Sequence, residues 1–516
     1  MLIEAIIAAC LLSAAVVFVS PDRYAHKLAL GLSVPPLALS LYAYAAFEGS
    51  GNALLGGEIA YETFTEWLRF GPYAVNYHVG LDGISLPLVV LSTVLTTLAL
   101  LSAWTPIDER QSEFYGLVLF LEGSLVGVFA ALDFVLWFVF WEAVLIPMYL
   151  LIGVWGGPRR KYAAIKFFVY TNIASLVMFI GYFGLVFGLG DAISSTGMPE
   201  VAQALRAGQL GSLGTSAAAI PADALAMGAF LAMFVGFAVK VPIVPFHTWL
   251  PDAHVEAPTP VSVLLAGVLL KMGTYALLRF NFTMLPEQAA ILAVPIAAIA
   301  VVSIIYGAML ALAQQDLKRV VAYSSVSSMG YVILGLIAYT VYGVGGATFQ
   351  MIAHGLISGL LFMTVGVFYN ATHTRMIGDM SGLAGRMPVT ATVFVAGAFA
   401  YMGLPLMAGF MAELFVFLGA FGSTVLPAAP VFTAAAMFGI VIVAGYLLWA
   451  MQRSLFGPFR LETDYELARA PAHDIVPIVT LLALVIALGV APDIFFEMIR
   501  DATLDVVAFD FGGESP

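Results

Sequence analysis

The stretch ALAMGAFLAMFVGFAVKVPIVPFHTWLPDAHV, residues 224–255, decides the fold of this chain. It is long enough to cross a lipid bilayer, which takes about 20 predominantly apolar residues. Lys240, Pro242 and Pro245 interrupt it near its middle. Each proline lacks an amide donor and clashes with the carbonyl four residues back, so the helix must break there. Since freed backbone groups at membrane depth must face protein or water, the sequence predicts a broken helix that lines a polar interior.

The rest of the chain has the same apolar character. Hydrophobic residues make up 62% of the 516 residues and charged residues only 10%, whereas soluble domains carry about 25% charged residues. No basic n-region precedes the first apolar run and no small-residue cleavage site is evident, so we expect this run to be retained as a helix. We predict an all-α polytopic membrane protein with about fourteen transmembrane helices, at 2–20, 27–47, 83–104, 113–131, 133–155, 162–190, 224–255, 260–280, 288–312, 319–341, 345–371, 389–420, 429–456 and 475–496.

The basic residues are distributed unevenly between the predicted loops. Fourteen of the twenty Lys and Arg residues fall on the side reached by the odd-numbered helices, four fall on the other side, and two lie inside helices. The cytoplasmic side of a bacterial membrane attracts Lys and Arg. We therefore expect a multi-pass protein of the bacterial inner (plasma) membrane, with both termini on the periplasmic side.

A second predicted span is broken in the same way as the first. Span 389–420 contains Gly403 and Pro405 near its middle. The broken spans are the seventh and the twelfth, and the odd offset of five predicts two inverted five-helix repeats, a sequence pointer to a transport site. We predict an N-terminal three-helix segment, a first repeat, a second inverted repeat, and a C-terminal helix and tail, at 1–112, 113–280, 281–456 and 457–516. Kinks that only adjust packing are the alternative reading.

Three ionisable residues lie in the middle of predicted spans, where each costs roughly 2.5–3.5 kcal/mol. Glu142 has no basic residue in its own span, so its partner must come from another helix. Lys240 lies at the first break and Lys271 lies mid-span. A desolvated lysine can exchange its proton when a neighbouring carboxylate moves, whereas an arginine stays charged. The pattern favours proton handling, and a static Glu–Lys pair that fixes helix packing is the alternative.

Further polar residues have weaker signals. Glu413 follows the second break as Lys240 lies at the first, and it is expected to be neutral or to face water. His354 has a side chain that titrates near about pH 6.5, which suits proton transfer, although a packing role is the more frequent one. Glu122 is similarly ambiguous, and Asp133 is expected to be structural at a helix boundary. The serines of 323–328 could order water between charged sites or could only permit close packing.

Several classes of function have no support in the sequence. Cys10 is the single cysteine, which excludes a disulfide framework and a cysteine-held iron–sulfur cluster within the chain. His247 and His254 are a weak candidate for a metal site, and we expect neither a metal nor a cofactor in this chain. No glycine pattern for nucleotide binding appears, and a net charge of −12 is not typical of a nucleic-acid-binding protein.

Two long motifs carry a family resemblance that covers essentially the whole chain. They are Pro245–Ser262, PFHTWLPDAHVEAPTPVS, and Leu317–Ser327, LKRVVAYSSVS. Both closely resemble the antiporter-like, proton-translocating family that includes membrane-arm subunits of NADH–quinone oxidoreductase, or respiratory complex I. The resemblance implies the fold predicted above. It also implies a subunit of an enzyme, a proton-translocating translocase of the electron transport chain, whose FMN, iron–sulfur clusters and sites for NAD and quinone are in partner subunits.

The resemblance also implies roles for individual residues in proton translocation. Glu142 would be the carboxylate partner of Lys240, and Lys240 and Lys271 would carry protons along a polar axis in the membrane plane. His354 would be an intermediate station, and Glu413 would end the path towards the outer side. Family members commonly have histidine where this chain has Ser328, and a serine cannot hold a charge at neutral pH. The path between Lys271 and Glu413 is therefore expected to differ locally or to use water.

Within the family the chain resembles the M-type branch, the counterpart of mitochondrial subunit 4. Related L-type and N-type chains usually carry lysine in the twelfth helix, where this chain has Glu413, and the L-type chain continues into a long lateral helix. The implied partners are the L-type and N-type subunits, the lateral helix of the L-type subunit, and membrane lipids. Two alternatives stay open, namely a subunit of a multisubunit cation/proton antiporter and a structural subunit that only spaces its neighbours.

Overall fold

The computed structural model describes residues 1–214, 219–463, 467 and 469–511. The predicted spans leave two long loops, at 48–82 and 191–223. The residues outside the described part are 215–218 in the second of these loops, and 464–466, 468 and 512–516 in the predicted C-terminal segment. The described part is mostly helical because apolar spans without water must satisfy their backbone groups internally.

The first half of the chain supplies an N-terminal group of helices, a hairpin and the first broken helix. Its helices and strands are α1 (Leu2–Phe18), α2 (Asp22–Ala45), β1 (Ala60–Phe70), β2 (Tyr73–Leu81), α3 (Ser85–Ser102), α4 (Gln111–Ala130), α5 (Phe134–Ala143), α6 (Leu145–Trp155), α7 (Arg160–Leu189), α8 (Met198–Arg206), α9 (Ala222–Lys240), α10 (Trp249–Glu256), α11 (Thr259–Leu264) and α12 (Leu270–Ala276).

The second half continues with long helices and the second broken helix. Its helices and strands are α13 (Pro286–Ile291), α14 (Ala293–Leu312), α15 (Leu317–Ile337), α16 (Val341–Thr372), β3 (Met380–Ser381), α17 (Pro388–Tyr401), α18 (Ala408–Phe421), α19 (Ala429–Leu455), β4 (Arg460–Leu461), α20 (Ala472–Val490) and α21 (Asp493–Val507).

The helical membrane fold confirms the predicted fold class. In the described part of the chain, twelve helical stretches are long and apolar enough to cross a membrane. The shorter apolar helices α1, α17 and α18 complete the agreement with the fourteen predicted spans, because α17 and α18 are the two pieces of the broken span 389–420. The other broken span, 224–255, is divided into α9 and α10.

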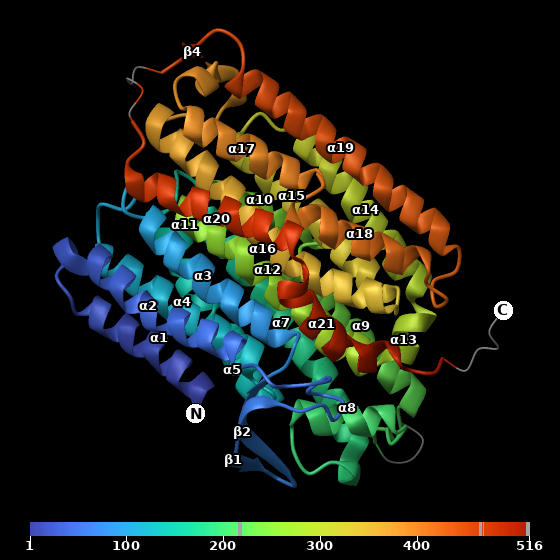
Figure 1. Ribbon diagram of the computed structural model, residues 1–516. Coiled ribbons are helices and arrows are strands. Elements are labelled where there is room, and N and C mark those ends of the chain that lie inside the picture. Colours follow the sequence, from blue (N-terminus) through green and yellow to red (C-terminus); the bar gives the residue numbers. More distant parts are fainter. Residues whose placement is uncertain (215–218, 464–466, 468, 512–516) are drawn as a thin grey trace.

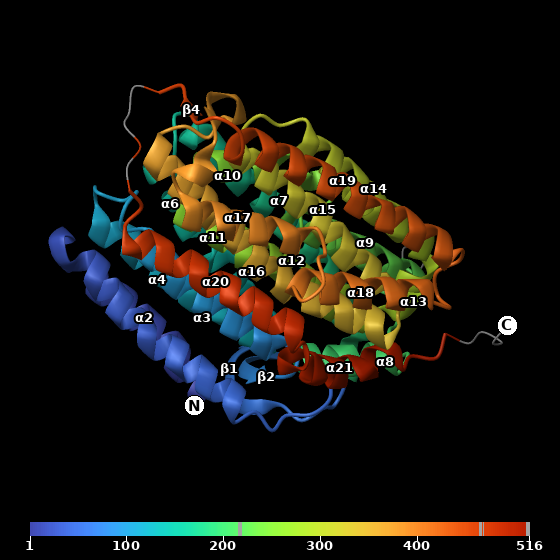
Figure 2. The same ribbon diagram turned by 45° about the horizontal axis from the view of Figure 1, so that its top comes forward.

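Two predicted loops and the tail contain secondary structure that the sequence pattern did not indicate. The first loop forms the antiparallel β1–β2 hairpin, and the second contains α8. Figure 1 shows both at one end of the helices, with β4 at the other end. Beyond α20 the described chain continues in a further helix, α21, which follows α20 in Figure 2 and packs against α16. The N-terminal amine donates to Thr63 of β1 at 3.0 Å, so the N-terminus lies at the hairpin end.

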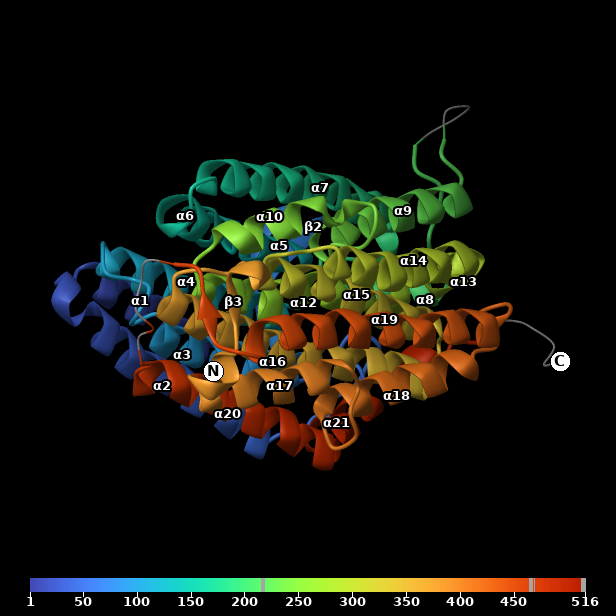
Figure 3. The ribbon, with the colours of Figure 1, turned by 90° about the horizontal axis from the view of Figure 1, so that it is seen from above.

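The core of the bundle is formed by three apolar spans. The most apolar stretches of the spans Thr259–Thr283 and Val341–Thr372 are wholly buried, and the most apolar stretch of α15 is nearly so. Figure 3 shows α12, α15 and α16 between α7 at one edge and α20 at the other. Gly267 and Gly355 permit a close approach of two of these spans, because a Cβ on residue 355 would lie 2.8 Å from the Gly267 carbonyl oxygen. These central helices carry two of the predicted site residues, Lys271 and His354.

Candidate functional site

The first helix break presents Lys240 to the protein interior. Helix α9 ends at Lys240, and the chain continues irregularly to α10. The indole Nε1 of Trp249 donates to the Val239 carbonyl at 2.8 Å, and the Val244 amide donates to Ser303 Oγ at 3.0 Å. Side chains therefore satisfy backbone groups that the end of α9 leaves without helix hydrogen bonds, as buried backbone groups require. The break is a defined structure rather than a gap in the helix.

The Lys240 ammonium is buried without a hydrogen-bond partner among the described residues. Its Nζ lies 3.8 Å from the ring centroid of Trp141, in a cation–π contact. Glu142, the next residue along α5, acts electrostatically on Lys240, but no ion pair within 4.0 Å joins them. The two residues are brought close as predicted, and their coupling stays a prediction.

Glu142 also lies at a helix interruption, which the sequence reading missed. Span 133–155 is divided at Val144 into α5 and α6. Pro147 is the signal that could have revealed it, because it cannot donate to the carbonyl of Ala143. Glu142 is half-buried, and Asn172 Nδ2 donates weakly to its Oε2 at 3.4 Å. Its Oε1 has no partner among the described residues, so this carboxylate is loosely held.

Lys271 lies between two irregular segments of one buried span. The stretches Leu265–Leu269 and Leu277–Thr283 are π-helical, and they flank α12 on both sides. Segments of π-helix are rare in proteins, and those that occur often lie at functional sites. The Lys271 Nζ lies 2.5 Å from the Ala266 carbonyl oxygen and 2.5 Å from His354 Nδ1. The structure thus joins two of the predicted residues in a direct hydrogen bond.

Gly273 brings the helices of Lys240 and Lys271 together. A Cβ at residue 273 would lie 2.9 Å from the Val241 amide nitrogen and 3.2 Å from the Lys240 carbonyl carbon. Only glycine allows α12 to pack this closely against the break at the end of α9. The two lysines therefore lie on helices in direct backbone contact, as a transfer between them requires.

The second helix break holds Glu413 beside a glycine turn. Helix α17 ends at Tyr401, and α18 begins at Ala408. Gly403 has φ +71°, and a Cβ there would lie 2.6 Å from Glu413 Oε2. The Glu413 carboxyl group is buried, and its Oε2 has no hydrogen-bond partner among the described residues. Ser328 Oγ donates to the Tyr401 hydroxyl at 2.8 Å next to this break.

The remaining candidates lie away from this line of residues. Glu122 is buried in α4 against Cys10 of α1. Asp133 caps α5 by accepting from the Val135 amide at 3.0 Å, in agreement with the structural role expected for it. The His254 ring stacks on Phe362 at 4.5 Å. Within the described residues, no group of three or more His, Cys, Asp or Glu side chains is placed to hold a metal ion.

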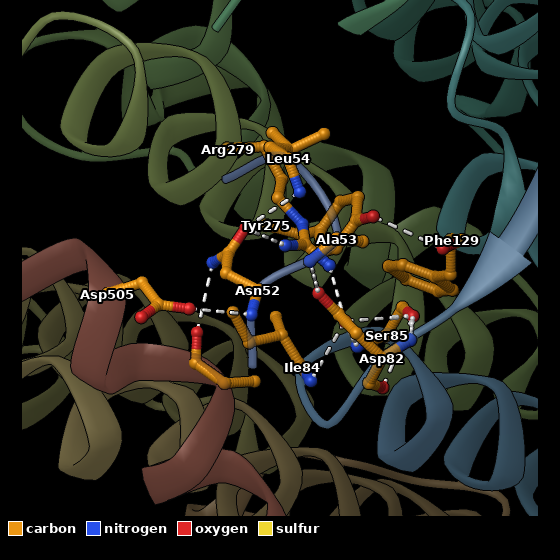
Figure 4. Close-up of polar contacts among 11 residues, drawn as sticks. Asn52, Ala53, Leu54, Asp82, Ile84, Ser85, Phe129, Tyr275, Arg279 and Asp505 are labelled. Atoms are coloured by element: carbon orange, nitrogen blue, oxygen red, sulfur yellow. Dashed lines mark hydrogen bonds and ion pairs between the residues drawn. The ribbon is translucent and has the colours of Figure 1, made fainter. Parts of the chain in front are cut away.

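A buried ion pair at the hairpin end was also missed. Arg279, at the end of the predicted span 260–280 and counted among the basic residues of the loops, lies in the second π-helical segment and is fully buried. Its Nη2 lies 2.5 Å from Asp82 Oδ1, and its Nη1 donates to Asn52 Oδ1 at 3.3 Å. Figure 4 shows these contacts together with Tyr275, whose hydroxyl donates to the Phe129 carbonyl. An arginine two turns from Lys271 was the available signal, because such a charge demands a partner.

The ion pair is tied to the C-terminal helix. Asp505 of α21 accepts from the Asn52 amide at 3.0 Å, and the Asn52 side chain donates to the Ala502 carbonyl at 3.0 Å. Asp82 also accepts from the backbone amides of Ala53, Ile84 and Ser85 at 3.0–3.1 Å. Within this cluster the Asp82 carboxylate therefore has all the partners that a buried charge needs.

Comparison with known proteins agrees with the fold. The family model for the NADH:quinone oxidoreductase/Mrp antiporter transmembrane region matches residues 131–442. The chain is 38% identical to F(420)H(2) dehydrogenase subunit M of Methanosarcina mazei, over 93% of this chain and 92% of that protein. It is also 38% identical to NADH-quinone oxidoreductase subunit M of Rhodobacter capsulatus, over 94% and 91%.

A solved structure has the same architecture. A chain of respiratory complex I from Thermus thermophilus aligns with a TM-score of 0.84 and 27% identity, over 98% of this chain and 99% of that chain. The matched family region contains both helix breaks, Lys271 and His354. On these grounds, the chain belongs to the NADH:quinone oxidoreductase/Mrp antiporter family of transmembrane proteins.

Proposed function

We propose that this chain is a proton-translocating membrane-arm subunit of a NADH–quinone oxidoreductase, which couples quinone reduction elsewhere in the complex to proton pumping. The observation that carries the proposal is the series of buried, incompletely paired ionisable groups along the two broken helices. Lys240, Lys271, His354 and Glu413 are all buried, and none of them forms an ion pair of 4.0 Å or less with an oppositely charged group in the part of the chain that the structure describes. The M-type relatives support the assignment to this branch.

Incomplete pairing distinguishes proton carriers from structural charges. Taking a permanent charge out of water costs several kcal/mol, which a well-made ion pair and its hydrogen bonds offset. A lysine can also avoid the cost by giving up its proton. Lys240 faces an aromatic ring, and Lys271 faces an imidazole and a carbonyl. These surroundings suit side chains that alternate between charged and neutral forms.

The geometry suggests an order of steps. Quinone reduction in another subunit changes the electric field along the membrane arm, which moves the loosely held Glu142 carboxylate towards or away from Lys240. When the pair separates, Lys240 releases its proton to Lys271 across the Gly273 contact. Lys271 hands a proton to His354 through their hydrogen bond, and a proton leaves by way of Glu413.

The internal repeats and the sidedness belong to the same proposal. Repeats at 113–280 and 281–456, between 1–112 and 457–516, place the broken span fourth in each repeat. The basic residues put the hairpin end on the periplasmic side of a plasma membrane, together with both termini. The partners are other membrane-arm subunits of L and N type, including the lateral helix of the former, and membrane lipids. FMN and iron–sulfur clusters belong to partner subunits.

A cation/proton antiporter subunit is the second candidate, because the matched family includes Mrp antiporters. Glu413 and the M-type relatives favour the oxidoreductase. A subunit that only spaces its neighbours is the third candidate, and the buried unpaired lysines argue against it, since a spacer gains nothing from them.

The deciding experiment is NADH-driven proton pumping in membrane vesicles that carry Glu142→Gln. We expect the complex to assemble and to oxidise NADH with an artificial acceptor at the normal rate, while quinone-linked turnover and pumping collapse. Glu122→Gln is the matched control, because it changes a buried carboxyl group that packs against α1 instead. Unchanged pumping in an assembled Glu142→Gln complex would exclude the proposed coupling.

A further inference from the structure

The Lys271–His354 pair ends in an imidazole nitrogen that has no partner. His354 Nδ1 lies 2.5 Å from Lys271 Nζ, and its Nε2 is buried with no hydrogen bond to any described residue. The ring that follows is that of Tyr401, whose centroid lies 5.9 Å from the His354 centroid with the two planes at 69°. A proton that reaches His354 therefore meets a phenol next.

Tyr401 is surrounded by hydroxyl groups from α15. Ser328 Oγ donates to its hydroxyl oxygen at 2.8 Å, and the hydroxyls of Ser324 and Ser325 lie next to the same phenol. All three serines are buried, on the helix face turned towards the second break. Their hydroxyls, unlike methyl groups, can each donate and accept a hydrogen bond at once.

The second helix break also places Tyr401 near Glu413, the next proposed proton acceptor. Tyr401 is the last residue of α17, and Gly403 two residues later presses against the Glu413 carboxylate. Tyr401 and Glu413 also interact electrostatically. Tyr401 thus lies between an imidazole with an unpartnered nitrogen and a carboxyl group with an unpartnered oxygen.

We propose that Tyr401, with Ser328, forms a hydroxyl bridge that carries protons between His354 and Glu413. The inference rests on the proposed function and adds two proton-relay residues to it. It accounts for a route through a helix position, 328, whose serine cannot hold a charge at neutral pH.

The bridge conserves protons and charge at each passage. His354 gives its Nε2 proton to a hydroxyl oxygen, either directly or through water, and the O–H bond on the other side of that oxygen breaks as its proton passes on towards Glu413. Each hydroxyl gains one proton and loses one, so it is neutral before and after. His354 is left neutral with its remaining proton on Nδ1, and it can accept from Lys271 again once that proton has returned to Nε2 by a turn of the ring or through water. Glu413 is left with the transferred proton.

The test compares variants in assembled complexes, with NADH-driven pumping and its solvent deuterium isotope effect as readouts. Tyr401→Phe removes only the hydroxyl and keeps the ring. We expect at least about a tenfold loss of pumping rate, which is less than the roughly hundredfold or more of a lost general acid or base because water substitutes in part for the hydroxyl. Tyr182→Phe is the matched control, since Tyr182 is a fully buried tyrosine of α7 whose hydroxyl donates to Thr196 at the hairpin end.

A compensating change makes the test specific for proton relay. In a Tyr401→Phe background, Ser328→His places a titratable ring beside the break, and we expect it to restore a large part of the lost pumping. Pumping that survives both Tyr401→Phe and Ser328→Ala at the wild-type rate and isotope effect would overturn the bridge, as would failure of Ser328→His to restore any of the loss. Glu142→Gln separates the two ideas, because normal pumping there overturns the proposed function itself, whereas collapse there with normal Tyr401→Phe overturns the bridge alone.

Discussion

Two cations on one buried span have opposite surroundings. Lys271 and Arg279 both belong to Thr259–Thr283, and both are fully buried. Arg279 meets a carboxylate at 2.5 Å, an amide oxygen at 3.3 Å and the face of Tyr275 at 5.0 Å. Lys271 meets only an imidazole nitrogen and a backbone carbonyl. One cation is fixed in place by its partners, and the other is held where its proton can leave.

The choice of residue fits the surroundings in each case. A guanidinium stays charged and offers five donors in a rigid fork, which suits a permanent anchor between the hairpin loop, α3 and α21. An ammonium can lose its proton in a low-dielectric site, which suits a carrier. The difference teaches that buried charge alone does not mark the route, because the number and kind of partners decide which charges can move.

The largest effect is expected from making the carrier resemble the anchor. Lys271→Arg keeps a cation and donors beside His354 but removes the ability to deprotonate, so pumping should fall by about a hundredfold or more. Arg279→Lys is the reciprocal control and should keep pumping in whatever fraction of the complex assembles. Vesicle pumping assays, normalised to assembled complex on native gels, measure both. Substantial pumping by Lys271→Arg would show that Lys271 does not titrate.

Removing the partner of the anchor should give the next largest effect. Asp82→Ala leaves the Arg279 charge buried and unpaired, which costs about 3–5 kcal/mol for a broken buried pair. Thermal unfolding of the detergent-solubilised complex should show a marked loss of stability or of assembly. Asp82→Leu combined with Arg279→Leu removes both charges and should recover most of the stability. A single variant as stable as the wild type would mean that water reaches Arg279.

A smaller effect is expected where the two lysine helices touch. Gly273→Ala forces a methyl group against Val241 and should cost about 1–3 kcal/mol, as overpacking does. It should also slow pumping, because it moves Lys271 away from Lys240. Gly228→Ala in α9 is the control, since no atom lies within 4 Å of the Cβ it would add. Equal thermal stability and pumping in both variants would show that the close approach is dispensable.

The smallest expected effect is a pH dependence in the stability of the β1–β2 hairpin, at the end of the bundle that contains the Arg279–Asp82 ion pair. Burial lowers the pKa of His78 below its ordinary value of 6.5, although the Glu62 carboxylate 2.9 Å away opposes the shift. The opened hairpin then binds a proton more readily than the closed one, so closure is favoured above about pH 6.5 and weakens as the pH falls further. Amide hydrogen exchange in 60–81, corrected for intrinsic rates, should be faster at pH 5.5 than at pH 7.5. His78→Gln should remove this difference, and a pH dependence that persists in it would assign the effect to another group.

Most of the fold could be predicted from the sequence because membrane spans are specified by length and apolarity. The broken spans were recognisable from Pro242, Pro245 and Pro405, and the structure divides the chain there. The hairpin at 60–81 was not recognisable, because β1 is largely exposed and carries no clear alternation of apolar and polar residues. The α5–α6 interruption was missed because Pro147 lies only three residues after it and the apolar run continues.

The candidate site divides in a similar way. Lys240, Lys271 and Glu413 were found because an ionisable residue stands out in an apolar span, and their part in pumping stays a prediction. Tyr401 and Arg279 were not found, because their significance depends on contacts with Ser328 on α15 and with Asp82 before α3. Such pairings join segments far apart in the chain, and no local sequence pattern predicts them.

The π-helical winding on either side of α12 has a consequence for chain length. Each residue of a helix turns the next side chain by about 100°, so the direction of Lys271 depends on the number of residues between it and the ends of its span. Each wide turn takes up an additional residue. Deleting a single residue from Leu265–Leu269 would rotate Lys271 away from His354 while leaving the hydropathy of the span unchanged. This span is therefore constrained in residue count as strictly as in composition, and it should tolerate substitutions better than insertions or deletions.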